Sequence, residues 1–159
     1  IITDNDALSP EYPMIELFRY LLLLLIFLSV SGCIGPVSAM IFLQNGSEIT
    51  REDLSVFTPE EWDAARTPLP IQFFYNSNCG SCQVALEFLR GLEKKNPKIS
   101  IAYHNLVIQD PNQQLYTQYK RDFNASDVPY PVIFLGDIGI SGSSDIIGHT
   151  ESLARSYLN

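Results

Sequence analysis

Strand-like and helix-like segments alternate along the chain from residue 71 onward, and this order restricts the fold more than any other feature. The order is strand, helix, strand, helix, two strands and a final helix. A helix that connects two strands of one sheet requires parallel members in that sheet and helices packed on its faces. We therefore expect an α/β fold. The segments cover, in order, residues 71–76, 79–95, 98–108, 110–123, 130–142 (both strands) and 143–158.

Local sequence signals bound these segments. The run IQFFYN is too short for a helix and too apolar for an exposed edge, so it indicates a buried central strand. Apolar residues then recur at intervals of three and four until the Asn-Pro pair at 96–97 ends the helix. The Asp-Pro pair at 110–111 begins the next helix, and the Gly-Asp pair at 136–137 predicts a hairpin turn.

The region ahead of the first strand carries a further helix signal. Thr58, Pro59 and Glu61 form a capping box that predicts a short helix. The TPLP run at 67–70 is expected to end this helix. Residues 40–43 are a short apolar run.

The composition fits one globular domain with its own core. The chain has 159 residues, of which 46% are hydrophobic and 18% charged. Such a chain buries enough apolar surface to fold without disulfides. Its net charge of −8, with ten lysines and arginines and no basic run, argues against nucleic acid as a partner. We expect a monomeric domain that contacts a membrane only through its N-terminal segment.

The first 39 residues resemble an export signal. An apolar stretch from Tyr20 to Val30 has the length of a secretory hydrophobic region and is shorter than the ~20 residues that span a bilayer. The acidic residues ahead of it are atypical of a signal, so we expect Met14 to be the true start and residues 1–13 to be an over-extended start. Residues 40–159 then form the folded domain.

Three fates of this segment fit its sequence. Cys33 follows Val-Ser-Gly at 30–32, which resembles the bacterial lipobox, so Cys33 is a lipidation candidate. Val-Ser-Ala at 37–39 instead resembles an ordinary signal-peptidase site, and cleavage there would remove Cys33. The third fate is an uncleaved anchor over residues 17–34. All three place the domain in an extracytoplasmic compartment of the cell envelope, where disulfides persist.

Two cysteines stand three residues apart at the start of the helix that follows the buried strand. Cys79 lies where unpaired backbone N–H groups and the positive end of the helix dipole favour an anion, which here is the thiolate. A lowered pKa increases the fraction of this reactive form. Cys82 lies one turn further on the same face and can attack a mixed disulfide at Cys79. Gly80 and Ser81 add no bulk between the two cysteines.

Two other uses of the cysteine pair fit less well. A zinc site needs four ligands, and the remaining candidates, His104 and His149, are forty-five residues apart. A static disulfide across so short a loop constrains the unfolded chain little, so it would add little stability. We expect no metal and no cofactor beyond the redox-active pair Cys79 and Cys82. His104 is expected to be a strand residue that pairs with a neighbour.

The strand IQFFYN, the CGSC pair and a later proline that leads into a hairpin together resemble the thioredoxin superfamily over about residues 54–159. The segment YPVIFLGD is spaced like the cis-proline segment of glutaredoxins. The resemblance implies that Pro131 is the cis-proline, with Pro129 as the alternative, and that Tyr130 and Pro131 hold the client near the cysteines. It also implies a thioredoxin-like fold, with a central mixed sheet of four to five strands and helices on both faces.

The chain departs from ordinary thioredoxins around the cysteines. Asn78 stands where thioredoxins have tryptophan, and the Gly-Ser spacer at 80–81 replaces Gly-Pro. Phe73 occupies the position of the buried acid, so water is expected to take the proton from Cys82. The Pro-Tyr spacer of glutaredoxins is absent, so glutathione use is not inferred.

These features predict an exported thiol-disulfide oxidoreductase. Cys79 would exchange with a client disulfide, Cys82 would resolve the mixed disulfide, and Pro131 would orient the client. The expected partners are protein thiols or disulfides and a redox partner that resets the pair. The alternative is a non-enzymatic thioredoxin-like module that binds a protein partner or delivers a metal ion through the two soft sulfur ligands. Reduction, oxidation and isomerisation of clients all stay open, because the reduction potential of the pair sets the direction of exchange.

Overall fold

The computed structural model of the chain describes residues 40–57, 68–107 and 110–158. The described residues all belong to one compact unit, residues 37–159. None of the helices in the described residues combines the length and the apolar character of a membrane span. The elements are β1 (Met40–Leu43), β2 (Glu48–Ile49), α2 (Arg51–Ser55), β3 (Leu69–Tyr75), α3 (Gly80–Lys95), β4 (Ile99–Asn105), α4 (Asp110–Asp122), β5 (Val132–Leu135), β6 (Ile138–Ser141) and α5 (Ser143–Leu158).

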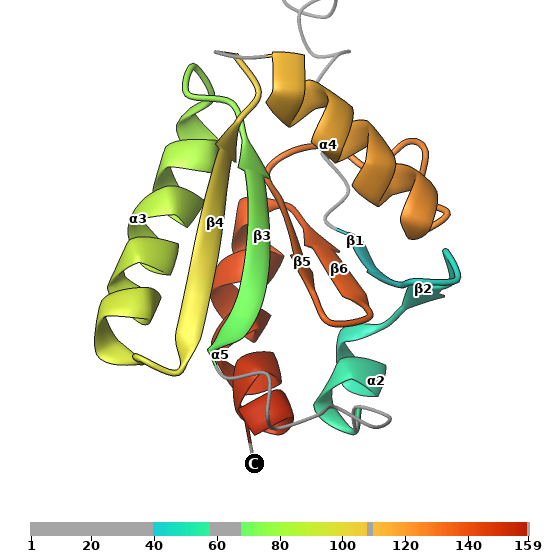
Figure 1. The fold of residues 1–159 in the computed structure, drawn as a ribbon. Helices are drawn as coiled ribbons and strands as arrows, with labels where there is room; N and C mark the ends of the chain where they lie inside the picture. Colours follow the sequence, from blue (N-terminus) through green and yellow to red (C-terminus); the bar gives the residue numbers. More distant parts are fainter. Residues whose placement is uncertain (1–39, 58–67, 108–109, 159) are drawn as a thin grey trace, which may run out of the picture. The chain divides into compact units, whose positions relative to one another are not determined.

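In the described residues, six strands form one mixed sheet in the order β2-β1-β6-β5-β3-β4 (Figure 1). β3 and β4 are parallel, and the other neighbouring pairs are antiparallel. The expected α/β class with a mixed sheet is confirmed, but the expected number of four to five strands is wrong. β1 extends the sheet beyond β6, and the two-residue β2 pairs with β1. Segments this short carry no alternating pattern, so only their pairing with distant residues identifies them as strands.

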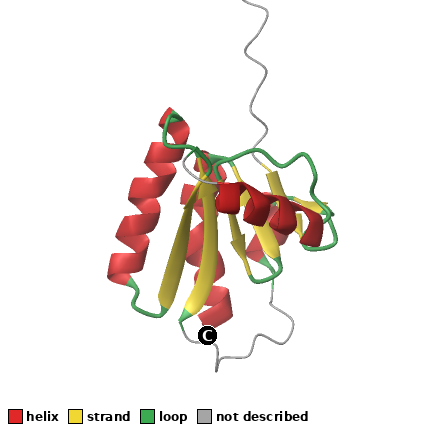
Figure 2. Ribbon diagram, turned by 45° about the horizontal axis from the view of Figure 1, so that its top comes forward, coloured by secondary structure: helices red, strands yellow, loops and turns green. Residues whose placement is uncertain are grey.

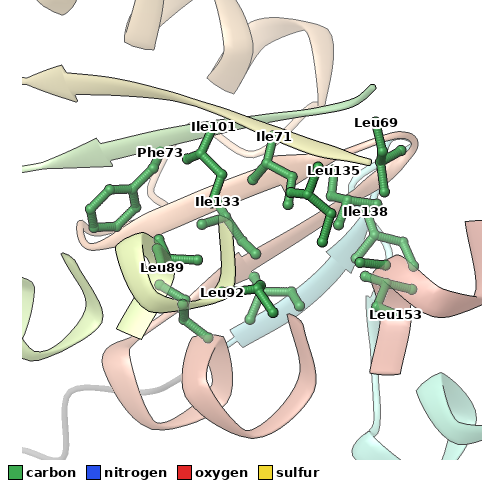
Figure 3. Close-up of a cluster of buried hydrophobic side chains, with 14 of the residues drawn as sticks. Leu69, Ile71, Phe73, Leu89, Leu92, Ile101, Ile133, Leu135, Ile138 and Leu153 are labelled. Carbon is green, nitrogen blue, oxygen red and sulfur yellow. The ribbon is translucent and has the colours of Figure 1, made fainter. Parts of the chain in front are cut away.

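Helices cover both faces of the sheet, as expected. α3 and α5 lie on one face, and α4 lies across the other (Figures 1 and 2). Residues of β3 point alternately to the two sides, because side chains of a strand alternate. Ile71 and Phe73 pack in the layer with α3 and α5, and Phe74 packs in the layer with α4. Figure 3 shows the first of these layers, in which branched aliphatic side chains fill the space between sheet and helices.

The layer under α4 is built largely from aromatic rings. The ring centroid of Phe134 lies 4.7 Å from that of Phe123 and 5.8 Å from that of Phe74. The ring of Phe42 meets Phe134 edge-on at 6.0 Å. Phe42 comes from β1, so the added strand contributes to this core and does not merely lengthen the sheet.

The central helix and the hairpin follow their predicted bounds. α3 has Cys79 as its N-cap and Asn96 as its C-cap, which confirms the helix expected from the spacing of apolar residues. β5 and β6 pair through Leu135 and Ile138 around a turn at Gly136, whose φ of +58° favours glycine. The expected Gly-Asp hairpin is therefore confirmed.

The region ahead of β3 differs from the prediction. β3 begins with Leu69 and Pro70, two residues before the expected start of this strand at residue 71. The backbone N–H of Leu69 points toward β4 and donates to the carbonyl of Lys98. The nitrogen of the next residue, Pro70, therefore points toward β5. β5 pairs with β3 only from Ile71 onward. A proline there removes no sheet hydrogen bond. The helix expected after Thr58 lies outside the described residues.

The structure contains a different capping box, at the start of α2. Thr50 accepts the N–H of Asp53 through its side chain, and the Asp53 carboxylate accepts the N–H of Thr50. The same carboxylate also accepts the Thr50 hydroxyl at 2.9 Å. In this box Asp53 stands where the motif usually has Glu or Gln.

A side chain from α3 bonds the outer edge of β4, which among the described strands pairs with β3 alone. The carboxylate of Glu93 accepts the backbone N–H of Ile101 at 2.8 Å and the hydroxyl of Tyr103 at 3.1 Å. It thereby occupies a backbone donor that a further strand would use for pairing.

We expect opposite effects from the same substitution at two glycines. A Cβ at Gly139 in β6 would overlap the ring of Phe42, whereas a Cβ at Gly91 in α3 would meet no other side chain or backbone within 4 Å. Gly139→Ala should lower the free energy of unfolding by about 1–3 kcal/mol through overpacking. Gly91→Ala should raise it by about 0.5–1 kcal/mol through helix propensity. Urea unfolding followed by circular dichroism measures both, and equal stability of the two variants would contradict the placement of Phe42 over β6.

Candidate functional site

The loop between β3 and α3 carries the two cysteines. β3 ends at Tyr75, and α3 begins at Gly80 with Cys79 as its N-cap. Asn76 shapes the turn: its side-chain oxygen accepts the N–H of Asn78 at 2.8 Å, and its carbonyl accepts the N–H of Cys79 at 3.1 Å. Asparagine favours such turns because its short side chain can bond the backbone two residues on. The turn thereby places Cys79 at the N-terminus of the helix.

The two sulfur atoms lie in different surroundings. Cys79 is partly exposed, Cys82 is fully buried, and both are free thiols. The backbone N–H of Cys82 donates to the Cys79 sulfur at 3.2 Å, and the Ser81 hydroxyl lies 3.1 Å from the same sulfur. The Cys79 sulfur therefore takes the place of an N-cap oxygen and accepts a first-turn N–H that would otherwise have no intrahelical partner. The space beside Gly80 is open.

The surroundings of Cys79 favour its thiolate form. Partial burial raises the pKa of this thiol, but hydrogen bonds from the Cys82 thiol and the Ser81 hydroxyl lower it, and the backbone N–H groups of both residues add to the lowering. The pKa of Cys79 is therefore below the ordinary value for a cysteine. Because the thiolate is the nucleophile in disulfide exchange, Cys79 is the reactive member of the pair.

The surroundings of Cys82 have the opposite effect. Burial raises the pKa of Cys82 to about 12, and the hydrogen bond to Cys79 and the charge on Cys79 act in the same direction. A hydrogen bond with the backbone of Asn76 offsets part of this rise. At neutral pH the buried sulfur thus keeps its proton, which it donates to the outer sulfur.

The segment ahead of β5 lies close to the cysteine loop. β5 runs antiparallel to β3 with Val132 opposite Phe74, so the residues ahead of Val132 lie past the end of β3. The peptide bond between Tyr130 and Pro131 is cis. The side-chain amide of Asn76 donates to the Tyr130 hydroxyl at 3.4 Å. The structure thus brings these two predicted residues to the cysteine loop, and their role in holding a client stays a prediction.

A second asparagine, Asn105 at the end of β4, holds the cysteine loop from the other side. Its side-chain oxygen accepts the N–H of Ser77 at 3.3 Å and that of Val107 at 3.1 Å. Neither Asn76 nor Asn105 was predicted from the sequence as a site residue. The available signal was an asparagine at the carboxyl end of each of two strands, since parallel strands bring these ends to one edge of the sheet.

Other residues singled out in the sequence make contacts that are structural. Phe73 is fully buried and stacks on Tyr75 with ring centroids 5.1 Å apart, so an aromatic ring fills the position expected to hold an acid in thioredoxins. The ring of His104 bonds the side chain of Gln72 at 2.8 Å, which confirms the expected pairing within the sheet. Burial lowers the pKa of His104, against a smaller opposing effect of a hydrogen bond. Pro129, the alternative cis-proline, is not preceded by a cis bond.

Two further predictions from the sequence concern metal binding and lipidation. Among the described residues, no group of three or more His, Cys, Asp or Glu side chains could hold a metal ion. Within that part of the chain, the two cysteine sulfurs therefore have no third ligand of these types close by. Cys33, the lipidation candidate, lies outside the described residues.

Comparison of the chain with family models, curated proteins and solved structures gives no match in any of the three. The function is therefore inferred from the two thiols and the residues around them.

We expect iodoacetamide to modify Cys79 in preference to Cys82 in the native protein. Alkylation needs the thiolate, so the rate at Cys79 should rise with pH and reach its plateau below the pH at which ordinary thiols titrate. Cys82, with a pKa of about 12, should stay unmodified at neutral pH. Substoichiometric labelling at a series of pH values, followed by peptide mass spectrometry, measures both rates. Equal labelling of the two cysteines would contradict the assignment of the nucleophile.

Removal of the Ser81 hydroxyl should raise the pKa of Cys79, because this hydroxyl stabilises the thiolate. Ser81→Thr keeps a hydroxyl and should keep most of the effect. Ser77→Ala is the control, since Ser77 contacts this site through its backbone. Thiolate absorbance near 240 nm as a function of pH gives the pKa. If Ser81→Ala and Ser77→Ala titrate alike, the hydroxyl does not stabilise the thiolate.

Proposed function

We propose that the protein is a thiol-disulfide oxidoreductase that exchanges the Cys79/Cys82 pair with disulfides of protein clients. One observation carries this proposal: the sulfur of a partly exposed cysteine, whose pKa is lowered, accepts hydrogen bonds from the backbone N–H and the thiol of a buried cysteine one helical turn away. An inert pair of buried cysteines needs neither the surface position nor the contrast in pKa. That contrast supplies a nucleophile and a resolving thiol in one site.

The first step in the reductive direction is attack by the Cys79 thiolate on a client disulfide. A bond forms between the Cys79 sulfur and one client sulfur, and the client S–S bond breaks. The second client sulfur leaves as a thiolate, which takes a proton from water. The N–H of Cys82 and the hydroxyl of Ser81 orient the attacking sulfur, and the open space beside Gly80 leaves room for the client.

The second step uses the change of charge that the first step produces. In the mixed disulfide Cys79 carries no charge, so its contributions to the high pKa of Cys82 disappear. Cys82 then loses its proton to water more readily and attacks the Cys79 sulfur. The Cys79–Cys82 disulfide forms, the client leaves as a thiolate, and two electrons have passed to the client. A partner dithiol restores the pair, and the same steps in reverse oxidise a client.

The arrangement of elements around the pair supports a place in the thioredoxin superfamily. A β-α-β unit, β3-α3-β4, leads through α4 to a hairpin and a final helix, and a cis-proline segment lies beside the cysteine loop. By this resemblance, Tyr130 and Pro131 would bind the client next to Cys79. The export-like residues 1–39 favour action in an extracytoplasmic compartment of the cell envelope, where client disulfides persist.

Insulin reduction by dithiothreitol tests the proposed activity. The wild-type protein should accelerate the reduction, and Cys79→Ser should abolish the acceleration, because the nucleophile is lost. Cys82→Ser should instead accumulate mixed disulfides with client proteins, since the resolving thiol is missing. These adducts should appear on non-reducing gels and disappear with reductant. The double variant Cys79→Ser/Cys82→Ser is the matched control and should trap no client.

The alternative function gives the opposite pattern. A metal-delivery module would show no turnover and no trapped client, together with tight binding of Cu(I) or Zn²⁺ by the wild type and none by the double-serine variant. That result would overturn the proposed enzymatic activity.

A further inference from the structure

A cavity of about 330 Å³ opens beside the proposed redox site. Asn76 and Tyr130, which belong to the two segments that meet at the cysteine loop, line it together with residues of α4. The carbonyl of Asn76 also accepts the N–H of Cys79. The cavity therefore begins at the loop that holds the nucleophile.

Lys120 of α4 brings a fixed positive charge to this cavity. Its ammonium group donates to the carbonyl of Ser126 at 3.1 Å and lies 4.9 Å from the ring centroid of Tyr116. Tyr116 is itself held in place, because it is buried and its hydroxyl donates to the carbonyl of Val128. An ammonium group has three protons, so the bond to Ser126 leaves donors for a carboxylate.

A second cavity, of about 360 Å³, adjoins the first at Lys120. Both cavities are lined by Thr117 and Lys120, so together they form one furrow that begins at the cysteine loop and follows α4. Arg121 lines the second cavity and adds another cation. Asp127 lies near this end, where its carboxylate accepts the hydroxyl of Ser126 at 3.2 Å. Lys120 is the cation that lines both cavities.

We propose that this furrow binds an acidic segment of the client polypeptide, a few residues from the client cysteine that reacts with Cys79. The inference rests on the proposed function, because the client must be held at Cys79. An elongated furrow suits an extended chain, which advances about 3.3 Å per residue. The protein has a net charge of −8, whereas the furrow beside the cysteine loop holds Lys120 and Arg121, so an acidic segment meets cations there. These cations would fix where the client chain lies.

Two model peptides with the same intrachain disulfide test the inference. One carries glutamates at the second to fourth positions outside each cysteine, and the other carries glutamines there. The wild-type protein should reduce the glutamate peptide about two- to fivefold faster in kcat/KM, as expected for one exposed charge pair. Lys120→Gln should remove this preference, so that this variant reduces the glutamate and glutamine peptides at equal rates. High salt should also weaken the preference by screening.

Lys95→Gln is the matched control. It removes the same charge from the last turn of α3, about 22 Å from the start of that helix at 1.5 Å per residue, and should keep the preference. Arg121→Gln provides a second variant and should weaken the preference, so the test does not depend on the folding of one protein. Lys120→Arg should retain it.

The outcomes separate this inference from the proposed function. Equal rates for the two peptides in the wild type, or a preference that survives both Lys120→Gln and Arg121→Gln, would overturn the acidic-client inference and leave the oxidoreductase intact. Failure of the wild type to reduce either peptide would overturn the proposed function, and this inference with it.

Discussion

The hydrogen bond from the Cys82 N–H to the Cys79 sulfur is the interaction on which the whole site depends. It makes a cysteine sulfur the N-cap of α3, a place usually taken by an oxygen of Ser, Thr, Asp or Asn. The same contact starts the helix, holds the two cysteines in reach of each other and favours a negative charge on the outer sulfur. Local structure and chemical reactivity therefore share this contact, and the Cys82 thiol and the Ser81 hydroxyl add further hydrogen bonds to the same sulfur.

The loop that carries this contact continues directly from β3, which holds it in place. β3 lies between β4 and β5, and its side chains fill the cores on both sides of the sheet. Burial of side chains such as Ile71, Phe73 and Phe74 stabilises the fold by roughly 1.5–3 kcal/mol each. The loop that continues from this strand is then tied by Asn76 and Asn105, so the cysteines are held by short polar side chains attached to a rigid core.

Sequence reasoning succeeded where the signal lies within one segment. The period of apolar residues and Asn96 bounded α3, the Gly-Asp pair marked the hairpin, and the two cysteines lie within four consecutive residues. It missed features that depend on segments meeting in space. β1 and β2 are recognisable only by their pairing, and Pro70 is tolerated only because β5 begins to pair one residue later. The tie at Asn105 and the furrow along α4 likewise depend on contacts between distant loops and helices.

Glu93 bears on how such a protein could work among unfolded chains. Its carboxylate occupies the backbone donor of Ile101 at the outer edge of β4. A protein whose clients are extended polypeptides would otherwise offer them a strand to pair with, and pairing there could spread from chain to chain. With this donor occupied, pairing at that edge is less favourable. Under the proposed function, a client that engages the cysteine end of the sheet would then leave after exchange instead of co-aggregating with the protein.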